Sequence, residues 1–275
     1  MTSMKTRILT AVIAIPLLVI VLFFGTKSFW VITTLVSAIS AFMTGELLTA
    51  KKLLTNFYIS IPCIAFSFAL PLFSHTPFMY VPVFVFILAL FIIIILKTDV
   101  CTYDDLSFAF TGSVIIAFGM SCLSYLCAIY ESYTAFFMVI TLAVPWMADA
   151  GAYFAGTFLG KHKLCPKISP KKTVEGFFGG AIFCVIGALL IGVIFANFIY
   201  ENIRVNYISL LIIGVLDSVV SVVGDLCFSI MKRHCKIKDY GSIFPGHGGM
   251  LDRCDSVIFT APLILLVNQL LPIIS

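Results

Sequence analysis

Side chains suited to phosphate chemistry gather in two clusters in the second half of an otherwise apolar sequence. The first cluster extends from Asp149 to Gly176, and its segment 161–172 contains five lysines. It ends on Ser169-Pro170-Lys171-Lys172-Thr173, directly before an apolar run. Amines and hydroxyls beside a helix start suit phosphate, because the first backbone N–H groups of a helix are unpaired and the dipole is positive there. The alternative is a basic loop that only rests on anionic lipid head groups.

The second cluster extends from Asp225 to Asp255 and combines carboxylates, bases and glycines. A set of carboxylate oxygens without His or Cys ligands suits magnesium. Asp252 and Asp255 are three residues apart, so they would share one face if a helix starts there. Asp225 falls inside the predicted membrane boundary, where an unpaired charge is costly, so we expect a cation beside it.

The same cluster contains the turn Gly246-His247-Gly248-Gly249, whose backbone N–H groups can surround an anion. Taken alone, this turn could equally be a tight loop with a solvated histidine. Four basic residues accompany it: Lys232, Arg233, Lys238 and Arg253. Their charges favour the phosphate interpretation. Three roles stay open for Asp217, which lies two turns before Asp225. It could support a neighbouring ligand, share a proton with another group, or make a helix-packing contact.

The elements that must position these clusters are membrane helices. Of the 275 residues, 61% are hydrophobic and 11% charged, and the mean hydropathy is +1.14, whereas about a quarter of the residues of a soluble domain are charged. We therefore predict an all-α polytopic membrane protein, a bundle of about nine transmembrane helices. The predicted spans are 8–24, 29–49, 57–73, 78–96, 107–129, 134–155, 176–200, 207–230 and 256–273.

The placement of basic residues predicts the orientation of this bundle. With nine spans, fifteen of the 17 Lys and Arg residues fall on one side, and only Lys27 and Arg204 fall on the other. Short cytoplasmic loops collect Lys and Arg, so the N-terminus is predicted to be cytoplasmic and the C-terminus to lie on the opposite side. The run 8–24 is expected to be a retained helix rather than a cleaved secretory signal.

We expect one membrane domain over 1–275. Residues 1–133 would form five scaffold and lipid-facing helices, and residues 134–275 four helices that carry the motifs. The nine cysteines, most of them in or beside apolar runs, are expected to be buried thiols, not disulfides or zinc ligands. Small residues allow close helix packing, which is the role expected for Gly176, Gly179, Gly180 and Gly187.

The motifs resemble those of a known family. The stretch Ser229-x-x-Lys232-Arg233-x4-Lys238-Asp239-x-Gly241-x3-Pro245-Gly246-His247-Gly248-Gly249-x-x-Asp252-Arg253-x-Asp255 is similar to the pattern of phosphatidate cytidylyltransferases, also called CDP-diacylglycerol synthases. Asp149-x-Gly151-Ala152-Tyr153 and Lys163-Leu164-x-Pro166-x-Ile168-Ser169-Pro170-Lys171-Lys172-Thr173 resemble that family too. The matched motifs cover about 149–256, whereas the first five helices match only in hydropathy and length. Ala150 and Cys254 depart from the pattern, which usually has a hydroxyl and an aliphatic residue there.

The resemblance implies transfer of the cytidylyl group of CTP to phosphatidate, giving CDP-diacylglycerol and pyrophosphate in phospholipid biosynthesis. It implies magnesium, with two divalent sites expected and an additional monovalent ion left open. The metal ligands it implies are Asp225, Asp252, Asp149 and Asp255. The catalytic residues it implies are Asp225, Asp252, Lys232, Arg233, Lys238, Asp239 and Arg253. The substrate-binding residues it implies are Lys161, Ser169, Lys171, Lys172, Thr173, Ser229, His247, Gly248 and Gly249.

The chemistry agrees, because a phosphate monoester has its second pKa near about 6 and is already a nucleophile at neutral pH without a protein base. A CTP-dependent polyprenol kinase is the alternative, and it would release CDP instead of pyrophosphate. A cation transporter is a distant alternative, because the basic loops of this chain would repel the cations that a transporter must carry. The expected partners are CTP, phosphatidate and membrane lipids, with no nucleic acid and with a homodimer left open. The expected location is a bacterial inner membrane, with the active site facing the cytoplasm.

Overall fold

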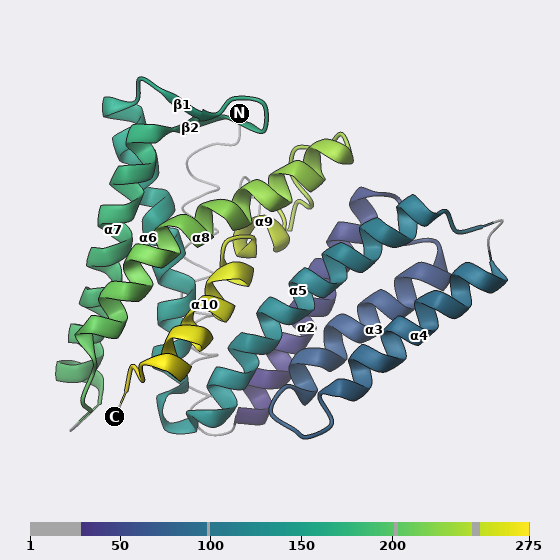
Figure 1. Cartoon of the computed structure of the whole chain (residues 1–275), viewed down its shortest axis with the longest axis horizontal. Coiled ribbons are helices and arrows are strands. Elements are labelled where there is room, and N and C mark those ends of the chain that lie inside the picture. Colours follow the sequence, from purple (N-terminus) through teal and green to yellow (C-terminus); the bar gives the residue numbers. More distant parts are fainter. Residues whose placement is uncertain (1–28, 98–99, 201–202, 244–247, 275) are drawn as a thin grey trace. The chain divides into compact units, whose positions relative to one another are not determined.

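A computed structural model describes residues 29–97, 100–200, 203–243 and 248–274, and its elements are labelled in Figure 1. The helices of the first half are α2 (Phe29–Ala50), α3 (Phe57–Phe73), α4 (Tyr80–Leu96), α5 (Tyr103–Ile129) and the 3₁₀ turn η1 (Glu131–Tyr133). The second half contains α6 (Thr134–Leu159), β1 (Lys163–Cys165), β2 (Ser169–Thr173), α7 (Val174–Ile194), the π-helical turn η2 (Phe195–Ile199), α8 (Tyr207–His234), α9 (Leu251–Cys254) and α10 (Val257–Leu270). Two compact units form: unit 1 comprises residues up to 135 with 234–254, and unit 2 comprises 136–233 with 255–275.

The described helices follow the predicted spans closely. Within the described residues, five helical segments are long and apolar enough to cross a membrane, and α3 and α4 are shorter apolar helices. The protein is therefore a helical integral membrane protein. The predicted span 8–24 lies outside the described residues, and the total of nine spans stays a prediction.

In unit 1, α2, α3 and α5 pack against one another, and α4 packs on α3. Their core is apolar and includes the stacked rings of Phe66 and Phe86, whose centroids are 4.2 Å apart. One buried polar contact joins two of these helices, because the hydroxyl of Thr44 on α2 donates to that of Ser67 on α3 over 2.7 Å. Such a bond satisfies both side chains where water is absent.

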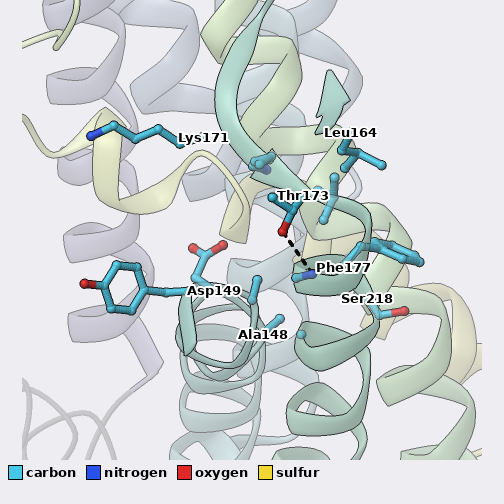
Figure 2. Close-up of a pocket in the computed structure, with 13 residues that line it drawn as sticks. Ala148, Asp149, Leu164, Lys171, Thr173, Phe177 and Ser218 are labelled. Carbon is cyan, nitrogen blue, oxygen red and sulfur yellow. Dashed lines mark hydrogen bonds between the residues drawn. The ribbon is translucent and has the colours of Figure 1, made fainter. Parts of the chain in front are cut away.

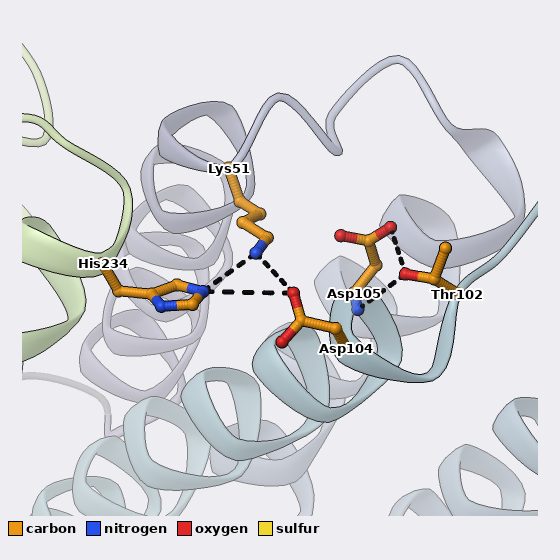
Figure 3. Close-up of polar contacts among 5 residues, drawn as sticks. All are labelled: Lys51, Thr102, Asp104, Asp105 and His234. Atoms are coloured by element: carbon orange, nitrogen blue, oxygen red, sulfur yellow. Dashed lines mark hydrogen bonds and ion pairs between the residues drawn. The ribbon is translucent and has the colours of Figure 1, made fainter.

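A polar network joins helix ends in unit 1 (Figure 3). The amine of Lys51 donates to Asp104 Oδ2 over 2.7 Å and lies 2.9 Å from Nε2 of His234, the last residue of α8. The hydrogen bond to Asp104 raises the pKa of Lys51. Thr102 caps α5 by accepting from the Asp105 N–H over 3.2 Å. A lysine that the sequence marked only as a cytoplasmic charge thus has a specific partner.

In unit 2, glycines bring α6 and α7 into close contact. A Cβ on Gly180 would lie 2.8 Å from the Ala148 carbonyl oxygen, and one on Gly176 would lie 2.8 Å from that of Ala152. A Cβ on Gly179 would clash with the side chain of Ala155, and one on Gly187 would lie 2.6 Å from the Met147 sulfur, both on α6. The predicted packing role of these four glycines is confirmed. All nine cysteines lie in described parts of the chain and are free, as predicted, with six of them buried.

Two local features correct the sequence-based expectations. First, the basic segment is not a plain loop in an all-α protein. It forms an antiparallel hairpin of β1 and β2, in which Lys163 pairs with Thr173 and Cys165 with Ser169. Pro170 has no N–H and disfavours helix for the residue before it, so this segment is extended rather than an early part of α7.

Second, Asp252 and Asp255 do not lie on one continuous helix. α9 ends at Cys254 and α10 begins at Val257. The Asp255 carboxylate accepts the Ser256 N–H over 2.9 Å, a group that an uninterrupted helix would bond to the carbonyl of residue 252. The side chain competes with the helical bond, so the condition for a shared helical face, one helix that includes both aspartates, is not met.

Candidate active site

Unit 2 contains a pocket of about 190 Å³ beneath the hairpin, between α6, α7 and α8. Its polar lining consists of Asp149, Tyr153, Lys171, Lys172, Thr173 and Ser218. The rest of its lining is largely apolar and includes Ala148, Ala152, Leu164, Phe177 and Val222. In Figure 2, Asp149 projects from α6, and Lys171 and Thr173 belong to β2 above it. One pocket therefore brings together four predicted site residues and places them beside an apolar wall.

The hairpin is held to the start of α7 by two polar side chains. Thr173 accepts the Gly176 N–H over 3.1 Å and caps the helix, as the dashed line in Figure 2 shows. Glu175 accepts the His162 N–H over 3.2 Å, and its carboxylate lies 2.7 Å from the ring Nδ1 of His162. Because α7 begins at Val174, Lys171 and Lys172 lie on the strand before the helix and not in its first turn.

The cation partner predicted for Asp225 is present. The amine of Lys172 lies 2.5 Å from Asp225 Oδ2, and the two side chains are 22% and 25% exposed. The partner comes from the first cluster, which the sequence separates from Asp225 by more than fifty residues. The ion pair therefore joins the two clusters within unit 2 and places Asp225 beside the pocket that Lys172 lines.

A further acidic residue, Asp255, is buried in the same unit. Burial raises the pKa of Asp255 well above its usual range, and the charges of Asp225 and Asp149 raise it further. The charge of Lys232, itself buried, acts in the opposite direction. The charges of two other predicted metal ligands thus act on Asp255. Within the described ranges no three Asp, Glu, His or Cys side chains form a group that could hold a metal ion, so the metal site stays a prediction.

In unit 1, Asp252 holds the turn that precedes it. Its Oδ2 accepts the N–H of Tyr240 over 2.8 Å and that of Gly249 over 2.9 Å. Gly248 has a φ of +86°, and a Cβ there would lie 2.9 Å from the same oxygen, so glycine is required. Asp252 belongs to unit 1, whereas Asp225 belongs to unit 2.

The remaining predicted residues differ in burial. Those that are exposed are Lys161, Arg233, Lys238, Asp239 and Arg253. Ser229 on α8 is buried, one helical turn before Lys232, and Ser169 is half-buried at the start of β2. His247 lies outside the described residues.

Sequence reasoning did not assign a role to Glu46 on α2. Its buried carboxylate accepts the N–H of Met250 over 3.0 Å and that of Leu251 over 2.7 Å, directly before Asp252. A signal was available, because Glu46 is the only acidic residue within the first five predicted spans. A carboxylate inside an apolar span is costly and marks a specific partner.

The three roles left open for Asp217 are narrowed by its contacts in unit 2. The side chain is fully buried on α8 and accepts the hydroxyl of Thr260 on α10 over 2.6 Å. The thiol of Cys184 on α7 lies 3.7 Å from its other oxygen. Asp217 therefore joins three helices, which supports the helix-packing role.

A helical membrane bundle whose pocket combines two lysines, an aspartate and an apolar wall has the features of a membrane enzyme that acts on phosphorylated substrates. Comparison with known proteins defines the class further: the model of the cytidylyltransferase family matches residues 5–271. The chain belongs to the cytidylyltransferase family and is an enzyme, a nucleotidyltransferase.

Curated relatives carry a more specific name. The chain is 36% identical to phosphatidate cytidylyltransferase of Bacillus subtilis, over 95% of this chain and 96% of the relative. It is 43% identical to the enzyme of that name from Staphylococcus epidermidis and 46% identical to that from Staphylococcus saprophyticus, each over 46% of this chain and 47% of the relative. The family predicted from the motifs is therefore confirmed.

Proposed function

We propose that this enzyme carries out the reaction for which its relatives are named, the transfer of the cytidylyl group of CTP to phosphatidate. A phosphate oxygen of the lipid forms a new bond to the α-phosphorus of CTP. The bond from that phosphorus to the oxygen bridging to the β-phosphate breaks, and pyrophosphate leaves. The observation that carries the proposal for this chain is the pocket that Lys171, Lys172, Thr173 and Asp149 line together with an apolar wall.

Phosphatidate has the chemistry that this pocket can recognise. Its phosphate monoester is anionic and nucleophilic at neutral pH, so the chain needs to orient it rather than deprotonate it. Lys171 and Lys172 supply positive charge for the phosphate, and the Thr173 end of β2 lies beside them. Phe177, Leu164 and Val222 supply an apolar surface for the glycerol and the first acyl carbons. Ser169 and Ser229 are proposed to assist substrate binding by the family resemblance.

The proposed metal is Mg²⁺, at two divalent sites with a monovalent ion left open. When bound, it would neutralise negative charge on the phosphates of the substrates. By the family resemblance, Asp225, Asp252, Asp149 and Asp255 would hold it, and their carboxylate oxygens are the ligand type that Mg²⁺ prefers. The buried position of Asp255 near two other acidic residues supports this proposal, because such a site gains from a cation.

The leaving pyrophosphate needs positive charge as well. By the family resemblance, this role falls to a set of basic residues, to Asp239 and to the backbone N–H groups of the glycine turn. The residues proposed for it are Lys161, Lys232, Arg233, Lys238, His247, Gly248, Gly249 and Arg253. Hydrogen bonds to charged groups contribute about 1.5–3 kcal/mol each, so several such contacts would stabilise the departing charge substantially.

The finer topology is also proposed: nine transmembrane helices, a cytoplasmic N-terminus, and an active site that faces the cytoplasm of a bacterial inner membrane. The 15 to 2 distribution of basic residues supports it. In a cysteine-free background, single cysteines at Lys167 and Ser242 should react with an impermeant thiol reagent only from the cytoplasmic side. A cysteine at the exposed Ser132 should react only from the other side. Labelling of Ser132 and Lys167 from the same side would refute this topology. A homodimer stays a prediction, which cross-linking in native membranes tests.

The reaction is tested with purified protein, phosphatidate, Mg²⁺ and CTP that is labelled at the α- or the γ-phosphate in separate assays. Cytidylyl transfer places the α-label in the lipid phase and the γ-label in released pyrophosphate. A CTP-dependent lipid kinase would instead place the γ-label in the lipid and release α-labelled CDP. The appearance of γ-label in the lipid would overturn the proposed reaction.

A further inference from the structure

Glu46 lies on α2, in the half of the chain that carries none of the family motifs. Its carboxylate uses both oxygens on the backbone of the segment that leads to Asp252. Oε1 accepts the Met250 N–H over 3.0 Å and Oε2 accepts the Leu251 N–H over 2.7 Å. The side chain is 8% exposed. A buried carboxylate with two charge-assisted hydrogen bonds is a strong and directional attachment.

Two glycines enclose the same carboxylate. A Cβ on Gly249 would lie 2.5 Å from Oε1 and 2.7 Å from Oε2 of Glu46, and a Cβ on Gly241 would clash with Oε1. The backbone at both positions therefore lies directly against the carboxylate. With both oxygens bonded to amides and two glycines packed on it, Glu46 has no room to bind a substrate. Its contacts are those of a group that acts through the backbone it holds.

Asp252 holds the same turn from the other side. Its Oδ2 accepts the N–H groups of Tyr240 and Gly249, so the three consecutive amides from Gly249 to Leu251 are bonded to one or the other carboxylate. The backbone from Gly249 to Leu251, directly before Asp252, is thus held by a residue more than two hundred positions earlier in the chain. We propose that Glu46 is a positioning residue for cytidylyl transfer, which holds the segment 248–252 so that Asp252 and the backbone of Gly248 and Gly249 are correctly placed.

This inference rests on the proposed reaction for its kinetic test, but its structural test is independent of activity. The key variant is Glu46→Gln, which keeps the size and one acceptor oxygen. Its NH₂ group meets a backbone N–H, so one of the two amide bonds is lost. The matched control is Glu131→Gln, the same chemical change at an exposed position of unit 1. The protein is the full chain in nanodiscs.

Hydrogen–deuterium exchange of peptides covering 248–254 should be faster in Glu46→Gln than in wild type and unchanged in Glu131→Gln. At saturating substrates, kcat of Glu46→Gln should fall by about ten- to a hundredfold, since small misplacements of reacting groups have effects of this size. The KM for phosphatidate, whose proposed contacts Lys171 and Lys172 lie in unit 2, should stay within about threefold. Glu46→Asp, which keeps the charge but shortens the reach, should lie between Glu46→Gln and wild type.

Unchanged exchange in Glu46→Gln would overturn the proposal, and so would faster exchange with unchanged kcat, which would leave Glu46 a role in stability alone. If Glu46→Gln does not fold, Gly241→Ala decides by the same criteria, because its methyl group displaces the carboxylate without removing its charge. In a double variant the two changes should not add, since both break one attachment. An inactive wild-type protein would count against the proposed reaction, whereas an active wild type with a normal Glu46→Gln would count against this inference.

Discussion

The amine of Lys172 lies 2.5 Å from the carboxylate of Asp225, so a proposed phosphate-binding group and a proposed metal ligand neutralise each other. The two side chains are 22% and 25% exposed, whereas the amine nitrogen of Lys172 is itself buried. A phosphate that approaches Lys172 would compete with Asp225 for it, and a cation that approaches Asp225 would compete with Lys172. The ion pair is therefore suited to stabilise the site before the substrates bind. When they bind, the phosphate would become the partner of Lys172 and the cation that of Asp225.

The two lysines of β2 should consequently differ when replaced. Lys171→Ala and Lys172→Ala should each lower kcat/KM by about ten- to a hundredfold through loss of a charge-assisted phosphate contact. Only Lys172→Ala also leaves Asp225 without its cation, so it alone should lower the thermal unfolding temperature. Steady-state kinetics and thermal unfolding in detergent measure the two effects. Lys167→Ala, in the exposed turn of the hairpin, is the control and should change neither. Wild-type kinetics in both β2 variants would return the hairpin to a membrane-anchoring role.

Asp252 should show two separable roles. Tyr240 and Gly249 both donate to the same Oδ2, so the single oxygen of Asn can keep both hydrogen bonds while the charge is removed. Asp252→Asn should retain slow amide exchange around residue 249 yet lose several orders of magnitude in kcat, with partial recovery at high Mg²⁺. Asp252→Ala should lose both properties. Near-normal turnover of Asp252→Asn with an ordinary Mg²⁺ dependence would show that the carboxylate serves the turn alone.

The hydrogen bond between Thr260 and Asp217 should contribute to stability and not to chemistry. Thr260→Val removes the donor from a fully buried carboxylate and should lower the free energy of unfolding by about 1–3 kcal/mol. Thr260→Ser keeps the hydroxyl and should restore most of that loss. Thermal or detergent-induced unfolding measures the change, while kcat should stay near the wild-type value. A large fall in kcat without a change in stability would assign Asp217 to the reaction instead.

Close packing of α6 on α7 should make Gly180 sensitive to a single methyl group. A Cβ there would meet the Ala148 carbonyl oxygen at 2.8 Å and the Ala152 Cβ at 3.2 Å, so Gly180→Ala must push the helices apart. We expect a loss of about 1–3 kcal/mol in unfolding free energy and lower activity, because both helices line the pocket. Gly45→Ala on α2 has nothing within 4 Å of the added methyl and should be neutral or slightly stabilising. Equal behaviour of the two variants would argue against this packing.

The helix boundaries were predictable because they depend on local properties. The predicted span 57–73 is identical to α3, and the predicted starts at 134 and 207 are those of α6 and α8. An apolar run of sufficient length must become a helix in lipid, since every backbone N–H and C=O must be bonded internally there. The packing role of the glycines was predictable because small residues allow helices to approach closely. The cation beside Asp225 was predictable because an unpaired charge within the membrane boundary is costly. The motifs likewise indicated the family, because they combine charged residues and glycines at fixed spacings.

The partners of the charged residues were decided only by tertiary structure. Hydropathy required a cation for Asp225 but could not select Lys172 among many lysines, and it could not pair Glu46 with an amide 205 residues away. The hairpin and the break between α9 and α10 also escaped prediction. In the hairpin, hydrogen bonds between the two strands replace those of a helix. At the break, the Asp255 carboxylate takes the N–H that a helical bond would use. Whether the local bond or the helical bond forms depends on the contacts around each segment. The sequence by itself determined which segments enter the membrane and which chemistry they carry, whereas folding determined which carboxylate holds which backbone or base. The physical reason is that burial is set by each residue's own polarity, while pairing is set by distances that only the folded chain creates.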